Sequence, residues 1–311
     1  MANSLYLQQT SIKMDIHTID LAFQNTEESI GVFLIETSIG PILIESGPES
    51  TFKQHEQALA TFGYTPKDIQ AVLLTHIHFD HAGAAWKFAQ NGTKIFVSPH
   101  GIKHLHNPEK LWNSAAMIYG DQMQTLWGTM QPIDQTLLIA ADEGNLLHFG
   151  DTTIEVLYTP GHAVHHNSYF LDDIIFTGDV AGCKIANGPV IPPCPPPDIN
   201  IELWKQSIEK IRAKQPKSLY LTHFAQHHNP TELLEQLETE LDNWANFIKP
   251  YFENNIDVEI ATQDFIQFVH KTYSKSGLSE REIKIYEYAN PCWMSLAGLL
   301  RYWKLRSENR I

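Results

Sequence analysis

Three histidines and one aspartate fall within six consecutive residues of this chain, directly after a short apolar run. Residues 76–81 read His-Ile-His-Phe-Asp-His, and the preceding residues 71–75 (AVLLT) have the composition of a strand buried on both faces. The next residues, 82–90, have an amphipathic helical pattern that Asn91 and Gly92 bring to an end. The six residues are therefore expected at a turn between a strand and a helix, where their side chains can converge.

The spacing within this segment favours metal binding at two neighbouring points. His76 and His78 are two residues apart in an extended turn, so their side chains can point to the same side. Asp80 and His81 begin the following helix and can face a second point a few ångströms away. A single histidine in a loop is usually solvated or hydrogen-bonded, but four ligand-type side chains packed together indicate a metal site.

Three later strands each end in a residue of the same chemical type. A Thr-Pro-Gly turn presents His162, the sequence Phe-Thr-Gly presents Asp179, and the sequence Leu-Thr presents His223. Each short pattern is common by itself. Together, these strand ends supply the imidazole and carboxylate groups that a site seeded by residues 76–81 would still lack.

The rest of the chain predicts a layered domain followed by helices. Short strands and helical segments share the first part of the chain, which favours an α+β or α/β catalytic domain over residues 1–226. Residues 227–311 have helical periodicity with breaks at Pro250, Gly277 and Pro291, so we expect an all-helical C-terminal region.

Composition limits the classes of function. Lys and Arg total 22 against 36 Asp and Glu, and the net charge of -14 disfavours nucleic acid and anionic membranes as partners. Three cysteines without a CxxC pair predict reduced thiols. The chain shows neither an export signal nor an apolar run long enough to span a bilayer, so we expect a cytoplasmic protein that acts on a small molecule.

The four motifs HIHFDH, TPGH, FTGD and LTHF, in this order, resemble the metallo-β-lactamase fold superfamily of hydrolases, particularly its glyoxalase II and lactonase-like branch. The resemblance covers roughly residues 30–224. It implies a four-layer αββα sandwich with a dinuclear metal site at one edge, here with a C-terminal helical region appended. Carried over position by position, it places His76, His78 and His162 on the first metal, Asp80, His81 and His223 on the second, and Asp179 between both.

These implied ligands are all imidazoles or carboxylates, a set that suits Zn, Fe or Mn. The resemblance implies two divalent metal ions per chain, with zinc as the first choice and iron or manganese as alternatives. Two such ions lower the pKa of a bridging water, so that hydroxide exists near neutral pH, and they polarise a carbonyl or phosphoryl oxygen of the substrate. No protein nucleophile is then required, although Asp80 is also a catalytic candidate for taking a proton.

Two residues are candidates for supporting these ligands through hydrogen bonds. His166 stands four residues after His162, as in the glyoxalase and lactonase pattern, and the alternative for it is a loop histidine that faces water. Glu45 occurs in the sequence Ile-Glu-Ser-Gly-Pro, where relatives more often carry Asp before the Gly. The longer carboxylate can still serve an outer position.

Substrate recognition is expected from segments outside the motifs. Residues 111–127 include the substrate-binding candidates Met117 and Tyr119, while helix packing is the favoured role for Trp293 in the C-terminal region. The proline-rich residues 188–198 (GPVIPPCPPPD) suit neither a sheet interior nor a helix, which predicts a stiff surface loop. An apolar and aromatic lining would favour an acyl or ring substrate over a polyanion.

The leading hypothesis is metal-dependent hydrolysis of a carbonyl ester, lactone or thioester. Phosphodiester hydrolysis is an alternative, because the same ligand set serves nucleases in the superfamily, but the acidic charge counts against it. A mononuclear iron enzyme similar to persulfide dioxygenases would keep the HxHxDH pattern with fewer ligands. A non-catalytic metal-bound effector module would be favoured by a lost ligand, and none is missing here. The apolar C-terminal helices also leave a homodimer open.

Overall fold

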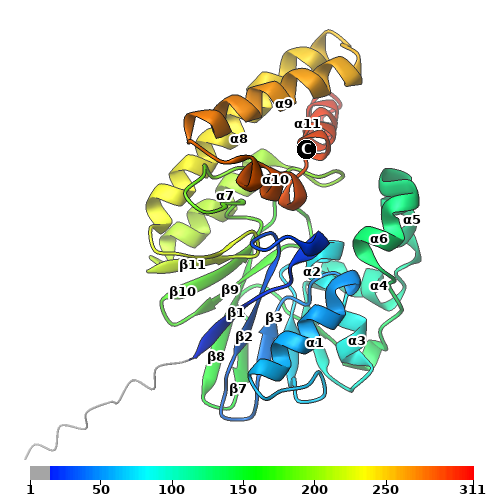
Figure 1. The fold of residues 1–311 in the computed structure, drawn as a ribbon, viewed down its shortest axis with the longest axis vertical. Helices are drawn as coiled ribbons and strands as arrows, with labels where there is room; N and C mark the ends of the chain where they lie inside the picture. The colour runs from blue at the N-terminus through cyan, green and yellow to red at the C-terminus, as the bar shows by residue number, and fades with distance from the viewer. Residues whose placement is uncertain (1–14) are drawn as a thin grey trace, which may run out of the picture.

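Two mixed β-sheets packed face to face form the centre of the molecule, and helices cover their outer faces (Figure 1). The computed structural model describes residues 15–311, so the first part of the predicted catalytic domain, with its N-terminal end, lies outside the described residues. The arrangement is the expected αββα sandwich with additional C-terminal helices, and the predicted fold class is confirmed.

Within the described residues each sheet has six strands. The first sheet consists, in spatial order, of β1 (Ile16–Asp20), β2 (Gly31–Ile35), β3 (Ile42–Ile44), β4 (Ala71–Leu73), β5 (Lys94–Val97) and β6 (Leu138–Ala140). The second consists of β12 (Ala225–His227), β11 (Ser218–Leu221), β10 (Ile174–Gly178), β9 (Asn167–Leu171), β8 (Thr152–Tyr158) and β7 (Leu146–Phe149). Strands β3 to β6 are parallel, as are β10 and β11, and the other pairs are antiparallel.

Alternate residues of the inner strands pack into different cores. On β2, Phe33 faces the second sheet, where its ring centroid lies 5.3 Å from the rings of both Phe176 and Tyr220. Its neighbours Val32 and Leu34 belong to the core between the first sheet and its covering helices. Because both faces of the strand are buried, its sequence is apolar throughout instead of alternating.

Short helices cover the first sheet, and one longer helix covers the second (Figure 1). The covering helices are α1 (Phe52–Thr61), α2 (Phe79–Ala82), α3 (Ala85–Ala89), α4 (Pro99–His106), α5 (Glu109–Tyr119), α6 (Met123–Trp127) and, on the second sheet, α7 (Ile201–Ala213). Four short 3-10 segments lie among the described residues: η1 (Phe23–Asn25), η2 (Glu49–Thr51), η3 (Gly120–Gln122) and η4 (Gln135–Leu137).

The C-terminal helices pack on α7 and share its hydrophobic core. They are α8 (Pro230–Glu253), α9 (Val258–Lys275), α10 (Glu280–Ala289) and α11 (Cys292–Ser307), and Figure 1 shows them together at one end of the molecule. Trp204 of α7, Trp244 of α8 and Phe265 of α9 are fully buried in this shared core. Among the described helices, none is both long enough and apolar enough to cross a bilayer.

The predicted break at Pro250 is wrong by part of a turn, because α8 continues through Pro250 to Glu253. A proline removes one helical N–H donor, which a helix tolerates more easily near its end. The carbonyl of Pro250 accepts hydrogen bonds from both the backbone and the side chain of Asn254, at 3.0 and 2.8 Å, and these contacts close the helix.

The proline-rich residues 188–198 do not form the surface loop that their composition predicts. Val190, Ile191 and Cys194 are buried in the core shared with the C-terminal helices. At Gly298 of α11, an added Cβ would lie 1.9 Å from the carbonyl oxygen of Cys194, so only glycine permits this close approach. Prolines suit a covered loop, because each removes an N–H group that would otherwise need a buried acceptor.

His55 on α1 is a buried histidine outside the predicted site. Its Nδ1 atom donates to the carbonyl oxygen of Ser46 at 3.3 Å, and its Nε2 atom has no hydrogen-bond partner among the described residues. The rings of Phe52 and Phe88 lie against it. Burial lowers the pKa of His55 from 6.5 to about 4, so the folded protein holds this imidazole neutral.

We expect His55→Leu to make the stability of the protein less sensitive to acid. The unfolded chain gains a proton at His55 as the pH falls below 6.5, whereas the folded chain gains it only near pH 4, so wild-type stability is lost across that window. Urea unfolding at pH 7 and pH 5 should show a loss that is smaller in the variant by about 2 kcal/mol. His148→Leu, at an exposed position, is the control. A loss of stability between pH 7 and pH 5 that is as large in His55→Leu as in the wild type would contradict the expectation.

Candidate metal centre

Four strands deliver the predicted site residues to one edge of the sandwich. Strand β4 leads into residues 76–81, while β8, β10 and β11, which all run in the same direction, lead to His162, Asp179 and His223. The backbone N–H of Asn167 donates to the backbone carbonyl oxygen of Thr75 at 2.7 Å. This hydrogen bond joins the two sheets at this edge. All seven predicted ligand side chains therefore meet in one cluster.

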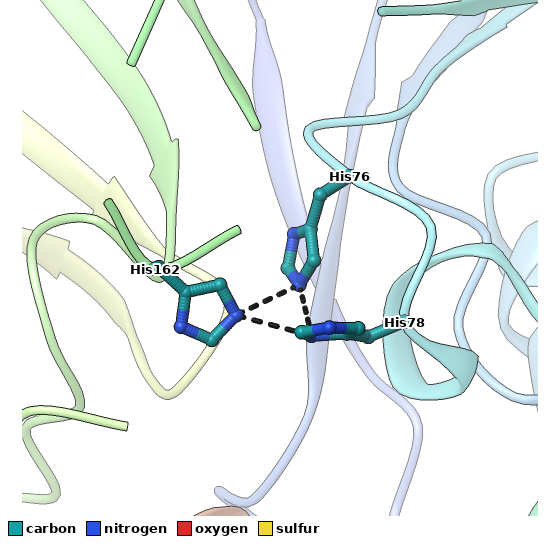
Figure 2. A group of neighbouring side chains, drawn as sticks. All are labelled: His76, His78 and His162. Carbon is teal, nitrogen blue, oxygen red and sulfur yellow. Dashed lines mark hydrogen bonds between the residues drawn. The ribbon is translucent and has the colours of Figure 1, made fainter. Parts of the chain in front are cut away.

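Three imidazoles form the first group, and Figure 2 shows their ring nitrogens turned toward one another. The Nε2 atom of His76 lies 2.9 Å from Nδ1 of His78. The Nε2 atom of His162 lies 3.2 Å from Nε2 of His76 and 3.1 Å from Nδ1 of His78. His78 thus presents its δ nitrogen, whereas the other two histidines present their ε nitrogens.

Hydrogen bonds on the far side of the rings fix which nitrogens carry protons. The Nδ1 atom of His162 lies 2.8 Å from the carbonyl oxygen of Pro193, which can only accept, so this nitrogen is the donor. The hydroxyl of Thr75 donates to Glu45 and therefore accepts from Nδ1 of His76 at 3.0 Å. Both Nε2 atoms are consequently unprotonated in the neutral rings, and their lone pairs face each other.

A cation resolves this repulsion, and the donor set fits one. Tetrahedral zinc with bonds of about 2.0–2.1 Å separates its ligand nitrogens by about 3.3 Å. The separations of 2.9, 3.1 and 3.2 Å within the first group are close to that value. The arrangement suits a divalent metal ion better than it suits three neutral imidazoles alone.

Asp80, His81 and His223 form the second group, and Asp179 lies between the two groups. The Nε2 atoms of His81 and His223 lie 3.5 and 3.3 Å from Oδ2 of Asp80. One carboxylate oxygen of Asp179 lies 3.1 Å from Nε2 of His81, and its other oxygen lies 3.4 Å from Nε2 of His162. This is the geometry of a carboxylate that can bridge two cations.

The second group also directs its Nε2 nitrogens inward. The Nδ1 atom of His223 donates to the carbonyl oxygen of Ser29 at 2.6 Å, and Nδ1 of His81 donates to Glu45 at 2.9 Å. The Nε2 atom of His81 and Oδ1 of Asp179 are buried and face each other at 3.1 Å, but they do not form a hydrogen bond with each other or with any other described residue. Buried polar atoms in native proteins are nearly always satisfied, so these two atoms indicate a site for a second cation.

Glu45 lies outside the ligand cluster and supports both groups through hydrogen bonds, in the role for which the sequence made it a candidate. Its buried carboxylate accepts from the backbone N–H of Thr75 at 3.1 Å, from Nδ1 of His81 and from the hydroxyl of Thr222 at 3.4 Å. Its backbone has a φ of +69°, a left-handed conformation that is uncommon for residues other than glycine. The strained residue is held by these hydrogen bonds, and a bond from its own N–H to the carbonyl of Leu73 at 2.9 Å assists.

His166 is buried, so it is not the water-facing loop histidine of the alternative prediction. Its Nδ1 atom donates to the hydroxyl of Thr159 at 2.9 Å, and its Nε2 atom accepts from the backbone N–H of Asp179 at 3.3 Å. Gly178, with a φ of +49°, allows this turn, because an added Cβ would lie 2.3 Å from the hydroxyl of Thr75. His166 therefore positions the backbone of Asp179.

Opposing charges control protonation in the cluster. Burial alone would lower the pKa of His81, but Asp179, Asp80 and Glu45 raise it well above its usual value. Burial would raise the pKa of Asp80, but His81 and His223 hold it well below its usual value. Burial would likewise lower the pKa of His223, but a hydrogen bond to Asp80 and the charge of Asp179 raise it. Protons on His81 and His223 thus partly balance the three carboxylates, a role that a divalent cation can take over.

The structure separates the two predicted substrate-binding residues. Tyr119, at the end of α5, is partly buried and packs edge-on against Trp127, with ring centroids 5.3 Å apart. Met117, on the same helix, is 83% exposed. Trp293 is 40% exposed, so the helix packing favoured for it describes only part of its surroundings.

Sequence reasoning missed the backbone groups that orient the imidazoles. The carbonyl oxygens of Ser29 and Pro193 fix the tautomers of His223 and His162, and no side-chain pattern points to a backbone acceptor. The supporting role of Thr75 could in principle have been recognised from the sequence. The dipeptide Thr-His occurs both here and before His223, and in each case the threonine hydroxyl donates to Glu45.

The family model of the metallo-beta-lactamase superfamily matches residues 26–223, and this chain belongs to that superfamily of metal-dependent hydrolases. It is 32% identical over 170 residues to the metallo-beta-lactamase fold-containing protein ST1585 of Sulfurisphaera tokodaii, a match that spans 53% of this chain and 64% of that protein. It is 27% identical over 261 residues to a hydroxyacylglutathione hydrolase of Mesorhizobium japonicum, spanning 79% of this chain and 86% of the relative.

Fold similarity extends further along the chain. The solved structure of the metallo-beta-lactamase family protein TTHA1429 from Thermus thermophilus superposes with a TM-score of 0.68 at 16% identity and covers 94% of both chains. Coverage this wide necessarily includes most of the C-terminal helices. The similarity concerns the fold alone.

We expect Glu45→Gln to weaken metal binding about 10- to 100-fold, the usual effect of losing an outer hydrogen-bond partner. An amide has one acceptor oxygen, so its NH₂ group would face one of the N–H or O–H donors that Glu45 now satisfies. Titration of the purified protein with a competing chelator measures the affinity. Exposed Glu36→Gln removes a carboxylate elsewhere as the control, and unchanged affinity in Glu45→Gln would argue against the supporting role.

Proposed function

We propose that this chain hydrolyses an uncharged carbonyl ester, lactone or thioester with the help of two divalent metal ions. The observation that carries the proposal is that imidazole nitrogens of both groups point inward, with the two oxygens of Asp179 between them. When bound, the metal ions supply an activated water and polarise the substrate's carbonyl oxygen.

We assign the residues in two sets that share one bridge. In this proposal the first ion is held by His76, His78 and His162, the second by Asp80, His81 and His223, and Asp179 contacts both. The nitrogen and oxygen donors suit Zn, Fe or Mn, and zinc is the first choice because it is typical of the superfamily.

Asp80 is the proposed acceptor of the proton that the reaction releases. Its side chain is 20% exposed, whereas those of His81, Asp179 and His223 are almost fully buried. A carboxylate that both faces the cluster and reaches solvent can pass a proton outward. The other carboxylates lack that access.

The charges around the centre favour an uncharged substrate over a phosphodiester. Among the described residues, no lysine or arginine forms an ion pair with any of the seven cluster side chains. Asp198 is close enough to act on the pKa of both His78 and His104, which adds negative charge at the site. Transfer at a phosphodiester often uses cationic side chains in addition to metal ions to stabilise charge, and no described lysine or arginine pairs with this cluster.

Similarity to the hydroxyacylglutathione hydrolase supports acyl chemistry in general and leaves the acyl group open. A polyanionic thioester such as one built on glutathione would need a group of basic side chains at the site. Lys271, Lys275 and Arg281 are spread over α9 and α10 instead of forming one group. A neutral lactone, ester or thioester is therefore the substrate class that we propose.

We expect His76→Ala and Asp179→Ala to lower both metal content and hydrolysis. Metal analysis should give two ions per wild-type chain and fewer in each variant. Activity on the best substrate from a panel of lactones, thioesters and phosphodiesters should fall by more than about 100-fold, beyond the effect of losing outer support alone.

His148→Ala, a change on the exposed face of β7, provides the matched control and should retain both properties. Full metal content and activity in His76→Ala or Asp179→Ala would refute the ligand assignment. A phosphodiester as the best substrate would refute the acyl class. One iron per chain with oxygen consumption on a persulfide would replace hydrolysis with oxygenation.

A further inference from the structure

The metal centre is reached from the side of Asp80 and His78. These two residues are partly exposed, whereas the other five members of the cluster are buried: His76, His81, His162, Asp179 and His223. A substrate must therefore approach past Asp80 and His78. Side chains that lie beside this opening are the ones that can contact the substrate.

Tyr119 lies near Asp80 and has an underused hydroxyl group. Trp127, which packs against its ring, also packs against Phe79, the residue before Asp80, with ring centroids 6.2 Å apart. Burial raises the pKa of Tyr119 well above its usual value, so the phenol remains a donor near neutral pH. Its hydrogen-bond acceptor among the described residues is the thioether of Met294, at 3.9 Å from oxygen to sulfur. A thioether is a weak acceptor, so the hydroxyl can exchange it for a better one at little cost.

Two separate parts of the chain hold the Tyr119 ring. Trp127 of α6 packs edge-on against it, and Trp293 of α11 does so as well, with the centroids of the Tyr119 and Trp293 rings 6.2 Å apart. In Figure 1 the α5–α6 segment and the C-terminal helices both extend beyond α2, the helix that carries Asp80. The first turn of α11 is thus brought to the opening through Tyr119.

The surroundings of Tyr119 are apolar as well as aromatic. Its neighbour Ile118 and its contact residue Trp293 are each 40% exposed, which is unusual for such large apolar side chains. A phenol within apolar surroundings suits a substrate that has one polar acceptor next to a hydrophobic group. An acyl compound with a carbonyl oxygen has this character.

We propose that Tyr119 donates a hydrogen bond from its phenol to the acyl oxygen of the substrate, and that Trp293 of α11 positions the ring for this contact. The inference rests on the acyl-hydrolase function proposed above and adds a catalytic residue to it. It also gives the C-terminal helices a part in the active site.

The test uses the full-length, metal-loaded protein and the best acyl substrate. We expect Tyr119→Phe to lower kcat/KM about 10- to 100-fold, the range for one hydrogen bond to an oxygen that gains charge in the reaction. Metal content and Tm should match the wild type. Tyr251→Phe removes a phenol that donates to Asp264 far from the site and should stay within twofold of wild type.

A double-mutant cycle tests the positioning role of Trp293. Trp293→Ala should lower kcat/KM several-fold in the wild-type background but have little further effect in Tyr119→Phe, because its contribution passes through the phenol. Additive losses would instead mean that Trp293 acts independently, which would overturn its assignment.

The experiments distinguish a failure of the Tyr119 inference from a failure of the proposed function. An active wild type together with a Tyr119→Phe variant within twofold of it would overturn the inference and leave the hydrolase function standing. A wild type that is loaded with metal and hydrolyses no acyl substrate would overturn the proposed function and this inference with it.

Discussion

The carboxylate of Glu45 joins chain segments that are far apart in sequence, and the geometry of the cluster depends on it. It follows β3 directly and accepts hydrogen bonds from Thr75 after β4, from His81 on α2 and from Thr222 after β11. A buried carboxylate is stable only where donors surround it, so each of these segments is held at a fixed distance from the others. The Nε2 atom of His81 is thereby aimed into the cluster before any metal binds.

The direction of the strands brings the other ligand residues together. Strands β8, β10 and β11 run the same way in the second sheet, so the residues that follow them arrive at one edge without long connecting loops. Apolar strands form a rigid platform, and ligand-type residues begin where each strand stops. The site is therefore built from short turns on a packed scaffold, which limits the movement that metal binding would require.

Sequence patterns predicted a layered domain and the residues that meet in the cluster, because strand burial and strand-end chemistry are both local properties, and the resemblance to the superfamily predicted the sandwich. They did not predict that residues 188–198 would be buried, since the C-terminal helices that cover this loop lie about 100 residues later in the chain. The carbonyl groups of Ser29 and Pro193 were likewise invisible, because every residue has one and only tertiary structure selects among them. The extension of α8 past Pro250 depended on contacts made by Asn254.

The buried proline loop joins the far end of the chain to the metal centre. Its Pro193 carbonyl fixes His162, while the next residue, Cys194, donates its N–H to the hydroxyl of Ser295 on α11 at 3.1 Å. Asn290, just before α11, also donates to this loop, at the carbonyl of Pro192 and a distance of 3.2 Å. A shift of α11 would consequently change the orientation of an imidazole that it never touches. In this molecule, substitutions in helices that look peripheral can act as substitutions in the metal centre.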